Sequence, residues 1–107
     1  MHINLLFILL FAVVVLLAYI IITGMEKRKE VTQTLLSLIE PTRNEEDCLG
    51  YILHEAIEEP GRFMFYEKWT SQTALDAHLA RPHMKEFLAK LDDLFEPLEV
   101  SVYKVLA

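Results

Sequence analysis

The residues best suited to chemistry lie in the segment RFMFYEKW, residues 62–69. Alternate side chains of a β-strand share a face, so Phe63, Phe65, Glu67 and Trp69 are predicted to point one way. Together they would combine an apolar floor with one carboxylate and one indole N–H, which suits a flat aromatic ligand. In that setting Glu67 could act as a base. The alternative role for Glu67 is a salt bridge at the edge of a strand.

Histidines and tyrosines near this segment supply further candidates. His54 and His78 could each titrate near neutral pH and act as the catalytic base, and the alternative for each is a hydrogen-bonded structural role. His83, Tyr51 and Tyr66 are candidates for ligand binding. Their alternatives are a helix-capping or surface role for the histidine, and core or interface packing for the tyrosines.

Several other kinds of site are not expected. The histidines lack the i, i+4 spacing of a zinc site on a helix, and Cys48 is the single cysteine, so no metal site is predicted. No catalytic serine elbow, phosphate-binding loop or dinucleotide fingerprint occurs in the sequence. A formal net charge of -6 argues against nucleic-acid binding.

The chain after Gly24 reads as a succession of helices and strands. Helical spacing of apolar residues predicts a helix over about 26–40 that Pro41 closes or kinks. Two strand-like runs then flank Pro60-Gly61, a pair suited to the centre of a type II turn, which predicts a hairpin. Ser71 is a candidate N-cap for one helix, and Pro82 can begin a second. Alternating residues from 98 to 106 predict a final strand.

The N-terminal stretch allows two interpretations. Leu5–Ile22 is an unbroken apolar run of the length that can cross a bilayer. Its second half is rich in valine, isoleucine and tyrosine, which favour strands, and Thr23-Gly24 supplies a turn. Either a strand begins near Val13 and residues 1–12 form an apolar extension, or the segment 3–22 is a membrane span. In both cases residues 5–11 would form an apolar patch that seeks a membrane or a partner protein.

The order of the elements favours the first interpretation. With a strand at 13–23 the chain becomes strand, helix, strand, strand, helix, strand, which is the ferredoxin-like split βαβ arrangement of an α+β protein. Without that strand the sheet would lose a central member. Residues 13–107 are therefore expected to form one domain.

Specific residues in this domain resemble the antibiotic biosynthesis monooxygenase family, which includes quinol monooxygenases. The marks are Cys48, Gly50-Tyr51, Leu53-His54, Pro60-Gly61-Arg62-Phe63, Tyr66-Glu67, Trp69, Ala77-His78 and Pro82-His83, in this order and spacing. The segment GMEKRKEV also resembles the family's loop into its first helix. The hydrophobic first strand and the apolar prefix depart from the family pattern.

The resemblance implies a dimeric α+β barrel in which two sheets pack face to face, and hence a homodimer. It also implies a cofactor-independent monooxygenase that uses no metal, flavin or haem. Such an enzyme would oxidise a quinol or polyphenol with O2 in an apolar pocket between sheet and helices. The alternative is a non-catalytic ligand-binding module, or an accessory subunit of a membrane assembly held through residues 3–22. If that segment spans a membrane, Lys27, Arg28 and Lys29 place the domain in the cytoplasm; otherwise a soluble cytoplasmic protein is expected.

Overall fold

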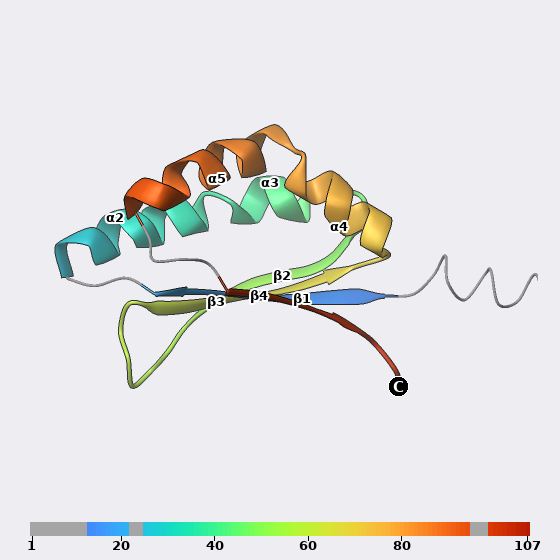
Figure 1. The fold of residues 1–107 in the computed structure, drawn as a ribbon, viewed down its shortest axis with the longest axis horizontal. Helices are drawn as coiled ribbons and strands as arrows, with labels where there is room; N and C mark the ends of the chain where they lie inside the picture. The colour runs from blue at the N-terminus through green and yellow to red at the C-terminus, as the bar shows by residue number, and fades with distance from the viewer. Residues whose placement is uncertain (1–12, 22–24, 95–98) are drawn as a thin grey trace, which may run out of the picture.

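The computed structural model describes residues 13–21, 25–94 and 99–107 of the chain. These residues form strands and helices that pack as one sheet with a layer of helices (Figure 1). Their order is β1 (Val14–Ile21), α2 (Met25–Leu36), α3 (Ile39–Arg43), β2 (Cys48–Glu55), β3 (Arg62–Trp69), α4 (Gln72–Leu79), α5 (Pro82–Leu94) and β4 (Glu99–Lys104).

The described strands form one antiparallel sheet in the order β2-β3-β1-β4. The helices all lie on one face of this sheet, and no described element covers the other face (Figure 1). The crossover from β1 through α2 and α3 leads to β2, which leaves room for β3 between them. This is the ferredoxin-like α+β fold that the order of elements predicts.

Strand β1 resolves part of the ambiguity in the N-terminal run. Val14–Ile21 pair with β3 on one side and, over most of their length, with β4 on the other, so β1 is a central strand. The strand predicted to begin near Val13 is present as Val14–Ile21, so these eight residues are not part of a membrane-spanning helix. No helix in the described part of the chain is long and apolar enough to cross a membrane. The expected apolar extension, residues 1–12, lies outside the described residues.

The first helical segment differs from its prediction. A single helix was expected over 26–40, but α2 ends at Leu36 and Pro41 lies inside the short helix α3. A proline ring collides with the carbonyl group four residues earlier, which here belongs to Ser37. The chain therefore leaves the helix at Ser37 and restarts, so that Pro41 falls in a first turn, where no amide donor is needed.

The hairpin between β2 and β3 follows the prediction closely. Arg62 N–H donates to the Glu59 carbonyl at 3.1 Å, which places Pro60 and Gly61 at the two central positions of the turn. Gly61 has φ 95°, a conformation that residues with a Cβ rarely adopt. This turn fixes the register of β3 and therefore decides which of its side chains face the helices.

The core lies between the sheet and the helices. Phe63, Phe65, Glu67 and Trp69 of β3 are all buried, whereas the residues between them are half-buried on the uncovered face. The predicted alternation along β3 is confirmed. The buried apolar residues that form the core are Val14, Leu16, Ala18, Val31, Leu35, Leu38, Tyr51, Phe63, Phe65, Trp69, Ala74, Leu75, Met84 and Phe87.

Candidate active site

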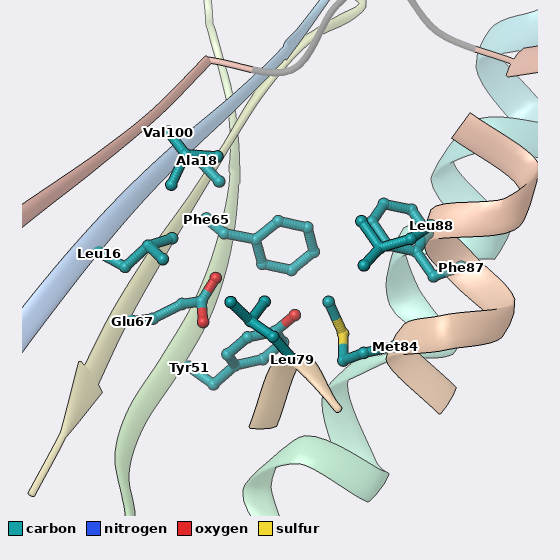
Figure 2. A pocket seen from close by; sticks show the side chains of 10 residues that line it. All are labelled: Leu16, Ala18, Tyr51, Phe65, Glu67, Leu79, Met84, Phe87, Leu88 and Val100. Atoms are coloured by element: carbon teal, nitrogen blue, oxygen red, sulfur yellow. The ribbon is translucent and has the colours of Figure 1, made fainter. Parts of the chain in front are cut away.

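A cavity of about 260 Å³ lies between the sheet and helices α4 and α5 (Figure 2). Leu16, Ala18, Tyr51, Phe65, Glu67, Leu79, Met84, Phe87, Leu88 and Val100 line it. Apart from Glu67 and the Tyr51 phenol, these described lining side chains are apolar. The cavity therefore suits an apolar molecule that presents a polar group to one wall.

Glu67 supplies that wall with a carboxyl group. Its neighbours across the sheet are Tyr51 on β2 and Leu16 on β1, and its side chain is directed toward the cavity (Figure 2). The residue is only 5% exposed. Burial raises its pKa from 4.5 to about 7, the Glu45 charge adds to the rise, and the N–H of Trp69 opposes it. A carboxyl with such a pKa can both accept and return a proton near neutral pH.

His78 lies directly behind Glu67 and is fully buried. Its Nε2 is 3.7 Å from Glu67 Oε1, and its ring stacks on the Trp69 ring with a centroid distance of 4.5 Å. Its Nδ1 lies 2.6 Å from Oε2 of Glu45, and because a carboxylate only accepts, we assign the proton to Nδ1. Nε2 then carries a lone pair that faces Glu67, and it has no hydrogen-bond partner. Burial lowers the pKa of His78 despite the attraction of Glu45, which keeps the ring neutral.

Glu45 connects His78 to the surface. It lies in the loop between α3 and β2, and its side chain is 7% exposed. Its Oε2 lies 3.2 Å from Nε2 of His83, and its Oε1 accepts from Nε of Arg81 at 3.3 Å. His83 also contacts the hydroxyl of Thr42 at 3.2 Å. Glu67, His78, Glu45 and His83 thus form a row that runs from the cavity to the outside.

Local structure places each member of this row. Ser71 caps α4 by accepting from Ala74 N–H at 3.1 Å, and one turn further along the helix His78 faces the sheet. Helix α5 begins at Pro82, as predicted, so His83 falls in its first turn. Arg43 of α3 donates to the Tyr51 carbonyl on β2, which anchors the loop that carries Glu45.

The ligand-type atoms of Glu45, His78 and His83 lie within 4.8 Å of one another, close enough in principle for a metal ion. Hydrogen bonds account for the cluster more simply. The short contact from His78 Nδ1 to Glu45 holds a proton where a metal would have to bind, and the guanidinium of Arg81 already neutralises the same carboxylate. We therefore treat this cluster as a hydrogen-bond network.

The structure brings together some of the sequence-derived candidates and separates others. Tyr51, Phe65 and Glu67 line the cavity, with His78 behind Glu67. The other two predicted cavity-facing residues of β3, Phe63 and Trp69, are buried on the same face without lining it. Trp69 instead donates its indole N–H to Glu67 at 3.2 Å.

His54, His83 and Tyr66 lie away from the cavity. His54 pairs across the sheet with Met64, so it lies on the uncovered face, where its ring nitrogen contacts the Met64 carbonyl at 3.3 Å. Tyr66 also points to that face. His83 lies at the outer end of the row behind His78.

Sequence reasoning missed Glu45 and the helical wall of the cavity. Glu45 stands in the polar run TRNEED, which has no periodicity to distinguish one acid from the next. Met84, Phe87 and Leu88 are recognisable as the apolar face of a helix, but nothing in their spacing shows that a cavity separates part of this face from the sheet.

Fold and site together define a ferredoxin-like α+β protein with an apolar cavity that contains one buried carboxyl group. The chain belongs to the antibiotic biosynthesis monooxygenase family, whose model matches residues 14–90.

Curated relatives and solved structures resemble the chain. The protein sll1783 of Synechocystis, of uncharacterised function, is 36% identical over 75% of this chain; the match covers 55% of sll1783, so the chain spans about half of that relative. YcnE of Bacillus subtilis, provisionally named a monooxygenase, is 36% identical over 81% of this chain and 92% of its own length. The structure of Rv0793 from Mycobacterium tuberculosis superposes with a TM-score of 0.83 at 29% identity, over 89% of this chain and 96% of that one.

Proposed function

We propose that the chain is a monooxygenase that oxidises a quinol or polyphenol with O2 and without a bound cofactor. The observation that carries the proposal is the Glu67 carboxyl, which has a pKa of about 7 and faces an otherwise apolar cavity in front of a neutral His78. The family and the provisional naming of YcnE and Rv0793 as monooxygenases support the reaction type. The substrate class rests on the resemblance to quinol monooxygenases, and the apolar cavity with one carboxyl group suits a flat aromatic ring.

The reaction begins with a proton transfer. Glu67 takes the proton of a phenolic hydroxyl and so forms the electron-rich phenolate that can react with O2. A new C–O bond gives a ring-bound peroxide, and the proton on Glu67 returns to it. The O–O bond then breaks and the C–H of the same carbon is lost, so one oxygen atom stays as a carbonyl and the other leaves as water.

The cavity supplies the remaining requirements. Its apolar walls exclude water from the phenolate and strengthen the interaction with Glu67. Phe65 and Leu16 of the sheet face Met84 and Phe87 of α5 across the space that a flat ring would occupy (Figure 2). Burial raises the pKa of Tyr51 far above neutral, so its phenol stays protonated and can donate a hydrogen bond to a developing negative charge.

The test is oxygen uptake by the metal-free protein with a panel of reduced quinols and polyphenols. We expect uptake above the spontaneous rate, and a loss of roughly 100-fold or more in Glu67→Gln, because the amide fills the same space without accepting a proton. The matched control is Glu86→Gln, the same substitution at an exposed glutamate of α5, and it should retain full activity. Uptake at the background rate with every compound would reject the proposal.

A second function, a non-catalytic ligand-binding module, remains the alternative. The observation that favours it is the cavity itself, since nearly all of its described lining is apolar and can hold a ligand without reacting with it. Quenching of the fluorescence of Trp69, which lies beside Glu67, would report binding. Saturable quenching without oxygen uptake would support this alternative.

We also propose that the chain forms a homodimer through the uncovered face of its sheet. Ile52 is 46% exposed there, and Val15, Leu17, Met64 and Tyr66 point to the same side. A sheet face this apolar is expected to be covered in solution, and the family resemblance implies a second copy of the chain.

A further inference from the structure

Behind the cavity, the row of acidic and histidine side chains continues to an open hollow between the end of α3 and the α4–α5 turn. We infer that Glu45 and His83 form a proton path that joins His78, and through it Glu67, to the solvent in that hollow. This inference rests on the proposed function, because it assigns a task to residues behind the proposed base.

The contacts make the path continuous. Glu67 Oε1 lies 3.7 Å from His78 Nε2, His78 Nδ1 lies 2.6 Å from Glu45 Oε2, and the same oxygen lies 3.2 Å from His83 Nε2. Only the first of these exceeds hydrogen-bond distance. A proton on Glu67 would shorten that contact, because Nε2 of His78 faces it and has no other hydrogen-bond partner.

Exposure rises along the path. The side chain of His78 is 0% exposed, that of Glu45 is 7% exposed, and that of His83 is 22% exposed. Glu45 and His83 both line an open hollow of about 470 Å³, together with Pro41, Asn44, Arg81 and Pro82. His83 is therefore the member of the row that solvent can reach.

Glu67 needs a route for proton exchange that does not pass through the cavity. Glu67 must be ionised before it can take a proton, yet its pKa lies near neutral, so it is often protonated. Once an aromatic ligand fills the apolar cavity, water cannot reach the carboxyl from that side. A row of hydrogen-bonding groups on the opposite side lets Glu67 exchange its proton while the cavity is full.

The charged groups around His78 agree with this task. Glu67 of β3 faces Nε2, Glu45 of the α3–β2 loop faces Nδ1, and Arg81 and His83 approach from the α4–α5 turn and the first turn of α5. Arg81 binds the Glu45 oxygen that His78 does not use, and so holds the carboxylate in place. We regard Arg81 as a positioning residue and Glu45 and His83 as the path.

Variants of His83 test the path through turnover. We expect His83→Ala to lower kcat about tenfold with little change in KM, since the ligand does not touch this side chain. Added imidazole should enter the hollow and restore the rate. His83→Gln should lose activity to the same extent, although it keeps a hydrogen-bonding group. The matched control is Asn44→Ala, which lies in the same hollow but outside the row, so that neither the substitution nor added imidazole should change the rate.

A second readout needs no turnover and so separates this inference from the proposed function. With naphthalene as an unreactive occupant of the cavity, the Nδ1 proton of His78 should give a downfield NMR signal. Its exchange with solvent should slow about tenfold in His83→Ala and not in Asn44→Ala. Unchanged exchange, or a loss of activity that imidazole does not restore, would overturn the path even if the wild-type protein consumes oxygen.

Discussion

At the scale of single residues, the site depends on how burial changes the protonation of Glu67 and His78. The carboxyl is held near half-protonation at neutral pH, and the imidazole is held neutral with its free nitrogen toward the carboxyl. An exposed glutamate would be ionised at this pH, whereas an exposed histidine would still be protonated in part. Burial is the main cause in both cases, and it is opposed by the Trp69 N–H at Glu67 and by the Glu45 carboxylate at His78.

The raised pKa of Glu67 predicts a characteristic dependence of stability on pH. The folded chain binds a proton between pH 4.5 and about 7 that the unfolded chain has released, so this residue destabilises the native state as the pH rises through that window. The full cost above pH 7 is about 3 kcal/mol. Urea unfolding of Glu67→Gln should therefore show its stability relative to wild type improving by about that amount between pH 4.5 and pH 8. A difference that does not change with pH would show that Glu67 has an ordinary pKa.

At the scale of secondary structure, short signals in the sequence position the site. The Ser71 cap starts α4 at the residue that brings His78 to the sheet, and the Pro60-Gly61 turn sets the register that brings Glu67 to the cavity. Glu55, at the end of β2, holds the hairpin turn to α2. Its carboxylate accepts hydrogen bonds from Arg28 of α2 and from the N–H of Gly61 in the turn. This pairing lowers the pKa of Glu55.

Removal of the cap should weaken α4. Ser71→Ala loses the acceptor for Ala74 N–H, and we expect the free energy of unfolding to fall by about 1 kcal/mol. Ser37→Ala is the control, because its hydroxyl donates to the Thr34 carbonyl at an exposed position. The control should change stability by less than about 0.5 kcal/mol in the same urea titration. Equal effects of the two substitutions would contradict the role assigned to the cap.

Periodic patterns in the sequence predict more of this fold than isolated polar residues do. Period-two alternation along β3 is a strong pattern, and the order of elements requires a strand within residues 13–23; the structure has that strand at Val14–Ile21. The predicted helix over 26–40 ends earlier than expected, at Leu36, because the ring of Pro41 would collide with the carbonyl group four residues before it. His54 and His78 lie on opposite faces of the sheet because of the register of β2 against β3. Glu45 reaches the site because the loop between α3 and β2 brings it beside His78. These are tertiary facts that no local pattern encodes.

At the scale of the whole molecule, the sheet separates two surfaces with different tasks. Its helix-covered face holds the core, the cavity and the row of side chains from Glu67 to His83, whereas its other face carries half-exposed apolar side chains and no described element (Figure 1). The proposed dimer through the uncovered face would therefore leave the cavity on the helix-covered face unblocked.

The proposed dimer predicts a measurable mass. Light scattering of the purified protein should give twice the 12.4 kDa of one chain. Ile52→Lys should shift the mass toward the monomer, because a lysine at this position would place a charge in the interface. Leu36→Lys, at an exposed apolar position on α2, should leave the mass unchanged. A monomeric wild-type protein would contradict the dimer.

Monooxygenase activity is tested most directly by following isotopically labelled O2 during turnover of a reduced quinol by the metal-free protein. We predict that one labelled oxygen atom appears in the product and the other in water, and that Glu67→Gln abolishes the incorporation. Saturable binding of the same compounds without incorporation of label would contradict the monooxygenase and leave a protein that only binds its ligand.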